Sequence, residues 1–111
     1  MSDRTPRLPT VSHLQYLALG LLRQRDRPGR EIRDEAGLFG VRRSAAAFYQ
    51  MMARLERDHL VEGWYGQVRV GDQAVTERRY RITPAGTRAW EQTRAFHEAV
   101  AAAGSRRWSN A

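Results

Sequence analysis

The chain has 111 residues, of which 41% are hydrophobic, so it has room for one domain with a modest core. Its 19 basic residues, all arginine, exceed its 12 acidic residues, and the net charge is +7. This balance favours a polyanionic partner because guanidinium groups match phosphate oxygens and guanine edges, although GC-rich coding bias also produces Arg- and Ala-rich chains. The absence of cysteine from these residues excludes disulfides, Cys-based zinc sites and thiol catalysis.

Residues 1–10 are basic, contain two prolines and show no hydrophobic periodicity, which predicts a flexible arm. They lack the apolar core of a signal peptide. No later stretch approaches the roughly 18 consecutive apolar residues that a membrane span needs. We therefore expect a cytoplasmic protein with no membrane partner.

Two helices are predicted next. Ser12 and Gln15 have the spacing of a capping box, and apolar residues then recur at helical intervals to about Gln24. The segment 26–29 interrupts this pattern. Pro28 suits the first turn of a second, shorter helix, whose few apolar residues are expected to point inward.

A third helix is predicted from Ser44 to Asp58, with Ser44 as its N-cap. Its apolar residues fall on one stripe, and Arg54 lies outside that stripe. We expect the polar side of this helix to face outward and its apolar side to lie beneath the hairpin that follows. The stripe consists of Phe48, Met51, Met52 and Leu55.

The hydrophobic pattern then changes to that of strands. Residues 60–65 are rich in strand formers, and residues 76–83 alternate between apolar and polar. The turn-forming residues at 66–71 lie between these two segments. The pattern therefore predicts a two-stranded hairpin with a connecting loop.

A fourth helix is predicted to begin with Thr83 as N-cap and Pro84 at its first position, and to stop at Gly104. Five of its residues are spaced four, three, four and three apart, which is the interval of a coiled-coil seam that could join two copies of the chain. The alternative is that this seam packs within one chain, as we expect for Trp90. The seam consists of Ala89, Thr93, Phe96, Val100 and Ala103.

The order helix, helix, helix, hairpin, helix predicts a mainly α fold with a small β hairpin, the winged helix-turn-helix. We expect this domain over residues 11–83, a dimerisation helix over 84–104 and a flexible tail over 105–111. In such folds the third helix enters the major groove of double-stranded DNA, and the hairpin, or wing, reaches neighbouring phosphates. A homodimer would place two third helices about 34 Å apart, so the expected operator is an inverted repeat.

Arginines lie where a duplex would pass in this fold. They precede the third helix, occupy its outer face and flank the second strand, where such cations supply phosphate contacts. The amide of Gln50 can pair bidentately with adenine. The residue pattern thus gives a first set of DNA contacts: Arg42, Arg43, Gln50, Arg54, Arg69, Arg78 and Arg79.

Several motifs between residues 11 and 90 resemble those of the PadR family of bacterial regulators. The strand-to-helix segment Tyr80–Gly86 matches best, although related winged-helix families such as MarR share much of it. The second helix keeps the Gly, Glu and Ile of the family's His-Gly-Tyr-Glu-Ile motif but lacks its His and Tyr. The other similar segments are Leu19–Leu22, Ala46–Tyr49, Arg54–Glu56 and Leu60–Glu62.

The resemblance implies dimeric binding of operator DNA, with the tyrosine of the third helix, Tyr49, as a contact. Ala46 and Ala47 stand where the family usually has Gly-Thr, which removes a hydroxyl that could meet a phosphate. Together with Ser44, these residues complete the predicted DNA-contact set. We expect a DNA-binding transcriptional regulator that acts as a homodimeric repressor.

The resemblance also implies that flat aromatic effectors can bind near the dimer interface. Trp90 and Phe96 are the candidates here, although packing alone explains such aromatics. The three histidines lack a common ligand spacing, and no nucleophile elbow or Gly-rich phosphate loop is present, so we expect no metal, no cofactor and no enzymatic activity. The alternative function is a winged-helix module that binds another protein through its Ala-rich third helix.

Overall fold

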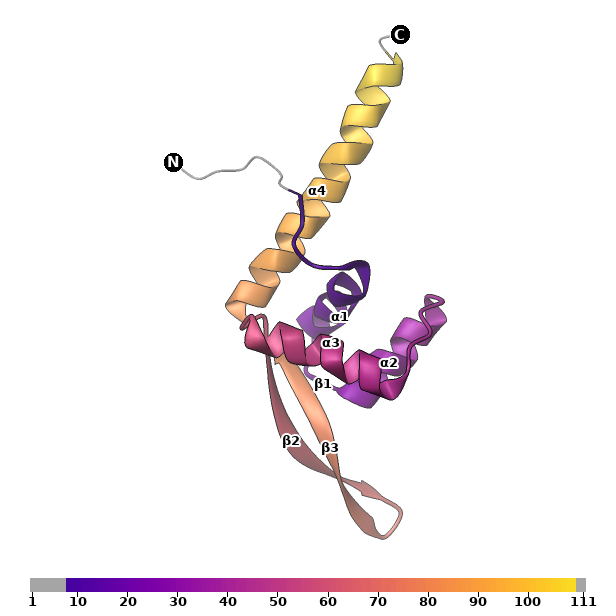
Figure 1. Cartoon of the computed structure of the whole chain (residues 1–111), viewed down its shortest axis with the longest axis vertical. Coiled ribbons are helices and arrows are strands. Elements are labelled where there is room, and N and C mark those ends of the chain that lie inside the picture. Colours follow the sequence, from indigo (N-terminus) through magenta and orange to yellow (C-terminus); the bar gives the residue numbers. More distant parts are fainter. Residues whose placement is uncertain (1–7, 110–111) are drawn as a thin grey trace.

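The sequence folds into four helices and a small antiparallel sheet (Figure 1). The computed structural model describes residues 8–109, with side chains described for residues 8–104. Most of the predicted N-terminal arm lies outside the described residues. The elements are α1 (His13–Gln24), β1 (Arg27–Pro28), α2 (Gly29–Leu38), α3 (Ala45–Arg57), β2 (Val61–Val70), β3 (Gln73–Ile82) and α4 (Pro84–Ser109).

Side-chain caps open three of the helices where the sequence predicts them. The Ser12 hydroxyl accepts from the Gln15 amide at 3.1 Å, and the Gln15 side chain accepts from the Ser12 amide at 2.9 Å, which completes the capping box of α1. Ser44 Oγ accepts from the Ala47 amide at 3.1 Å at the start of α3. Thr83 Oγ1 accepts from the Gly86 amide at 3.0 Å at the start of α4.

The hydrophobic core lies where α1, α2 and α3 meet the base of the sheet. The predicted stripe of α3 is entirely buried there, which confirms the orientation expected for this helix. Tyr80 of β3 is also buried and closes the core from the side of the sheet. The core consists of Leu14, Ala18, Leu19, Leu22, Ile32, Ala36, Phe48, Met51, Met52, Leu55, Val61 and Tyr80.

The sheet differs from the predicted hairpin in having a third strand. The two-residue strand β1 pairs with the outer edge of β3, so the strand order is β1-β3-β2. A two-residue strand leaves no alternating pattern in the sequence, so hydrophobic periodicity does not predict it. It fixes the start of α2 directly against the base of the wing.

The wing is also longer than predicted. Strand β2 continues through Val70, which pairs with Gln73, so the expected loop at 66–71 is wrong and only Gly71 and Asp72 form the turn. Gly66 lies inside the strand, where a Cβ atom would come within 2.6 Å of Arg79 Cδ. Gly66 is therefore present because the Arg79 side chain passes close to the backbone here. From the sequence alone, a glycine in such a strand cannot be told from a glycine in a turn.

Helix α4 does not stop at Gly104 but continues to Ser109. A glycine that caps the C-terminus of a helix usually has a positive φ, as Gly40 does after α2, but Gly104 does not. One glycine lowers helix stability by only about 1 kcal/mol, so the helical residues on both sides carry the helix through it. The 26 residues of α4 span about 39 Å at 1.5 Å per residue, and the helix extends well beyond the helical body (Figure 1). None of the described helices is apolar over a stretch long enough to cross a lipid bilayer.

A tight junction joins the end of α3 to the start of α4. His59 adopts a positive φ of 59°, and its carbonyl accepts a hydrogen bond from Thr83 Oγ1 at 2.7 Å. The Leu60 carbonyl accepts from the Thr83 amide at 3.1 Å. Gly86 lies so near this carbonyl that a Cβ atom would stand 2.0 Å from Leu60 O. The junction thus requires glycine at position 86.

The substitution Gly86→Ala should lower the free energy of unfolding by about 1–3 kcal/mol or more, because the added methyl group collides with backbone rather than with a flexible side chain. Urea denaturation measures this decrease. The matched control is Gly37→Ala in α2, where a Cβ atom would have no heavy atom among the described residues within 4 Å. That control should be neutral or stabilising by up to about 1 kcal/mol. Equal stability of Gly86→Ala and the unmodified protein would contradict the close approach.

A buried arginine holds α1, β1 and α2 together. The side chain of Arg27 donates to the Leu21 carbonyl at 3.0 Å, to Gln24 Oε1 at 2.6 Å and to Glu31 Oε1 at 2.7 Å. Glu31 also forms an ion pair with Arg25. Burial by itself raises the pKa of Glu31, but the hydrogen bonds and charges of Arg25 and Arg27 outweigh it and lower that pKa below the ordinary 4.5.

A carboxyl group with a lowered pKa in the folded state stabilises the fold above pH 4.5, and this contribution is lost as the pH falls through the lowered value. We therefore expect Glu31→Gln to lower stability at pH 7 by about 1 kcal/mol, because partial exposure keeps the contribution of these charged hydrogen bonds modest. The difference from the unmodified protein should shrink as the pH is lowered below 4.5. Urea denaturation at a series of pH values measures it, with the exposed carboxylate of Asp34 on the same helix, changed to Asn, as the control. A difference that is independent of pH would contradict the ionic role of Glu31.

Candidate nucleic-acid interface

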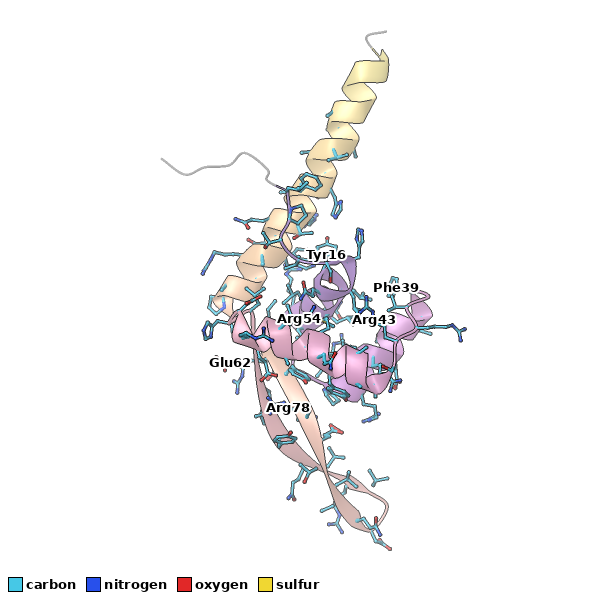
Figure 2. The ribbon with its side chains drawn as sticks, viewed as in Figure 1. Tyr16, Phe39, Arg43, Arg54, Glu62 and Arg78 are labelled. Carbon is cyan, nitrogen blue, oxygen red and sulfur yellow. The ribbon has the colours of Figure 1, made fainter. Side chains whose placement is uncertain are left out.

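The outer face of α3 is open to solvent. Because its apolar stripe is buried, the opposite side exposes Gln50 and Arg54, as predicted, together with Arg57. Ala46 is also exposed, so the first turn of the helix presents a bare surface to which another molecule can approach closely. Figure 2 shows Arg54 on α3 and Arg78 on the wing below it.

The turn that precedes α3 adds two exposed cations. Arg42 and Arg43 are both exposed, as expected for contacts to phosphate. Arg33 of α2 donates to the Arg43 carbonyl at 3.2 Å and fixes the backbone of this turn. Arg33 was not among the predicted site residues, because its neighbour across the turn is ten positions away in sequence.

Three other predicted contact residues lie at the edge of the open face. Tyr49 is half-buried and meets Phe48 edge to face, with ring centroids 5.2 Å apart. Its ring covers Gly29, where a Cβ atom would lie 2.7 Å from Tyr49 Cε1. Ala47 is half-buried, and the hydroxyl of Ser44 is engaged as the helix cap. Tyr49 is therefore only partly available to a ligand, whereas Ser44 remains exposed.

A groove separates the wing from the helices. Its volume is about 800 Å³, and it carries a cation, Arg30, on α2 and the ring of Tyr49 on α3. No sequence pattern indicates Arg30 as a site residue, since the wing's position beside α2 depends on β1. Arg69 is exposed on the wing, as predicted. The remaining lining residues are Val68, Val70, Val75, Thr76, Glu77 and Arg78.

Arg78 and Arg79 of β3 are paired with carboxylates rather than free, unlike the cations expected for phosphate contacts. Arg78 Nη2 lies 2.5 Å from Glu56 Oε1 on α3, and Arg79 Nη1 lies 3.0 Å from Glu77 Oε2. The side chains of Arg78 and Arg79 are only 26% and 30% exposed, because they lie close to Gly63 and Gly66 of the neighbouring strand β2. Glu56, the partner of Arg78, is brought close by the tertiary fold, and Glu77, the partner of Arg79, lies on the same strand. Counting charges along the sequence reveals neither pairing.

Beside this cluster, burial raises the pKa of the Tyr80 hydroxyl to about 12. Arg78 opposes this change, but burial dominates. Tyr80 is therefore a neutral core residue at physiological pH, and it supplies no charge to the interface.

The predicted dimer seam on α4 is divided between two environments. Because α1 covers the first half of α4, Thr93 is only 3% exposed and offers no open surface to a partner. Ala89 packs against the core and is half-buried. Phe96 is half-buried. Val100, which is 54% exposed, and the partly exposed Ala103 lie on the part of α4 beyond the helical body. The predicted seam is therefore wrong for Thr93, and for its other residues it stays a prediction.

Trp90 packs within the chain, as expected. Its ring stacks on Tyr16 with centroids 5.7 Å apart, and the guanidinium carbon of Arg23 lies 3.8 Å from its centroid. Trp90 and Phe96 line two neighbouring concavities that have His13 and Tyr16 in common. Trp90 borders the open apolar one of about 590 Å³ that also contains Phe39, and Phe96 borders the one of about 290 Å³.

The concavity beside Trp90 is the larger candidate for an aromatic effector, which stays a prediction. Figure 2 labels Tyr16 and Phe39 on this side of the molecule. Within the part of the chain that the structure describes, no three His, Cys, Asp or Glu side chains are grouped so that they could hold a metal ion.

Comparison with solved structures reveals the same architecture in bacterial and archaeal regulators. A PadR family transcription regulator from Clostridium difficile superimposes with a TM-score of 0.72 at 16% identity, over 86% of this chain and 97% of its own. A transcriptional regulator from Clostridium thermocellum gives 0.67 at 22% identity, over 87% of this chain and 97% of its own. The chain has the PadR winged-helix fold.

One similar structure includes DNA. Bacillus subtilis PadR in complex with operator DNA superimposes with a TM-score of 0.56 at 21% identity, over 72% of this chain and 45% of its own. No protein-family model matches the sequence, and no curated protein matches it significantly. The likeness therefore lies in the fold.

Proposed function

We propose that this protein is a PadR-type transcriptional regulator that binds double-stranded DNA through α3 and the wing. The observation that carries the proposal is the open outer face of α3, where Gln50 and Arg54 are exposed between the cations of the preceding turn and Arg69 of the wing. A groove beside this face separates it from the wing. Bacillus subtilis PadR, which has a similar fold, forms a complex with operator DNA, and this supports DNA as the partner.

The chemistry of the exposed side chains fits a division of tasks. Arg42 and Arg43 are exposed on the turn before α3 and Arg69 is exposed on the wing, and we assign them to phosphates of a duplex whose major groove holds α3. Gln50 lies on the outer face of α3, within reach of base edges. The cations thus supply affinity and orientation, and Gln50 supplies preference among sequences.

The substitution Arg54→Ala should weaken binding to every duplex, because it removes a cation that neutralises phosphate. The slope of log affinity against log salt concentration should become shallower by about 0.9 for each phosphate that the variant no longer neutralises. Gln50→Ala should weaken binding to a selected operator by about 1–3 kcal/mol and leave binding to random duplex nearly unchanged. Fluorescence anisotropy with fragments selected from genomic DNA measures both effects.

Arg94→Ala is the matched control, because Arg94 lies on α4 in an ion pair with Glu98 and its substitution removes the same charge from a different part of the molecule. It should change affinity less than twofold. An unmodified protein that binds no duplex at low salt would refute the proposal. It would favour instead the alternative function, binding of a protein partner by the Ala-rich start of α3.

We further propose that the protein acts as a homodimer on an inverted-repeat operator and represses transcription. The end of α4 extends beyond the helical body and exposes Val100. The concavity between α1 and Trp90 is lined by apolar side chains that include Leu17, Leu21 and Phe39. A second copy could cover both surfaces by placing its α4 against α1, as a two-heptad seam alone is too short to hold a dimer.

The substitution Val100→Asp should therefore shift the protein from dimer to monomer, because it introduces a charge into an apolar contact. Sedimentation velocity measures the shift. Affinity for an inverted repeat should fall by at least tenfold, whereas affinity for a single half-site should change little. Ala101→Asp is the control, since Ala101 is exposed one position away and off the seam. A protein that is monomeric when bound to its operator would contradict the dimer proposal.

A further inference from the structure

The ion pair between Arg78 and Glu56 connects two elements that are far apart in sequence. Glu56 lies on the last turn of α3, and Arg78 lies on β3, with 2.5 Å between Arg78 Nη2 and Glu56 Oε1. The guanidinium carbon also lies 4.8 Å from the ring centroid of Tyr65, its cross-strand neighbour on β2. The Arg78 side chain thus contacts α3 and connects it to both strands of the wing.

The fold leaves a specific space for this pair. Gly63 on β2 lies directly beside it, and a Cβ atom there would come within 2.6 Å of Glu56 Oε1 and 2.8 Å of Arg78 Nη2. Any other residue at position 63 would displace the ion pair. The side chains of Arg78 and Glu56 are only 26% and 27% exposed, so water screens their interaction less than it screens a surface pair.

The base of the wing is held by β1 and by buried Val61 and Tyr80, but the outer part of the wing has fewer ties to the helices. Beyond the pair the wing continues as a two-stranded ribbon, which is marginally stable by itself. The second ion pair between the wing and the helices, Arg30 with Glu77, is longer at 3.5 Å, and the Arg30 side chain is 67% exposed. A surface pair of this kind contributes little to rigidity.

We propose that Arg78 is a positioning residue that, with Glu56, fixes the angle between the wing and α3. The wing's exposed Arg69 and the outer face of α3 can then contact one duplex together. The inference rests on the proposed DNA-binding function, and it replaces the phosphate contact that the sequence predicts for Arg78. A free carboxylate near bound DNA would repel it, and the pairing of Glu56 with Arg78 gives this carboxylate a structural role.

The decisive variant is Glu56→Gln, because the two roles for Arg78 predict opposite effects. If Arg78 were a phosphate ligand, removing the carboxylate would release it and leave DNA affinity equal or higher. If the pair positions the wing, affinity should fall about tenfold. Arg78→Met should weaken binding to a similar extent without changing the salt slope, and the double variant should be no weaker than either single variant.

The matched control is Glu62→Gln. Glu62 pairs with Arg81 at 3.4 Å on the same two strands, but both side chains are more than half exposed and neither belongs to α3. This variant should change affinity by less than twofold. Circular dichroism and urea denaturation of each variant establish that the affinities are those of folded protein.

Hydrogen exchange of the free protein tests the tie without DNA. Backbone amides of β2 from Tyr65 outward should exchange faster in Glu56→Gln and in Arg78→Met, and in the double variant they should exchange no faster than in either single variant. Exchange equal to that of the unmodified protein would overturn the proposal. So would a salt slope that becomes shallower by about 0.9 in Arg78→Met, combined with unchanged or tighter binding by Glu56→Gln.

These outcomes separate the two proposals. A protein that binds no DNA but shows the expected exchange would refute the DNA-binding function and retain the tie between α3 and the wing. A protein that binds DNA normally after removal of the pair would retain the function and refute the positioning role.

Discussion

The one-sided burial of α3 is the constraint on which the rest of the molecule depends. Phe48, Met52 and Leu55 are almost completely inaccessible to solvent, and each contributes about 1.5–3 kcal/mol by leaving water. These contacts come from α1, α2 and the base of the sheet, so the helix is held entirely from one side. The opposite face needs no interaction within the chain and is free to carry side chains chosen for a ligand.

The junction between α3, the wing and α4 is determined by the segment Tyr80–Gly86. Tyr80 fills the core, Thr83 bonds to the carbonyls and amides of two neighbouring elements, and Gly86 allows α4 to touch the Leu60 carbonyl. Each position is determined by packing or backbone geometry. The motif therefore identifies an architecture, and it connects the helix that would read DNA to the helix that would join two copies.

Arginine has two distinct uses in this protein, and they differ in environment rather than in sequence context. Arg27 is buried and bonds to three acceptors around the start of α2, and Arg78 and Arg79 are paired with carboxylates at the base of the wing. Arg42, Arg43 and Arg54 are exposed on or beside α3. The count of 19 arginines thus overstates the number of cations available to a polyanion, because several are paired with carboxylates within the fold.

The sequence by itself determined the helices, their caps and the buried stripe of α3, because hydrophobic periodicity and capping hydrogen bonds act between residues a few positions apart. It also placed Gln50 and Arg54 on the open face. The tertiary structure alone decided the third strand, the burial of Thr93 beneath α1 and the pairing of Arg78 with Glu56. Each of these features depends on contacts between residues that are distant along the chain. Local sequence patterns do not indicate which distant residues come into contact.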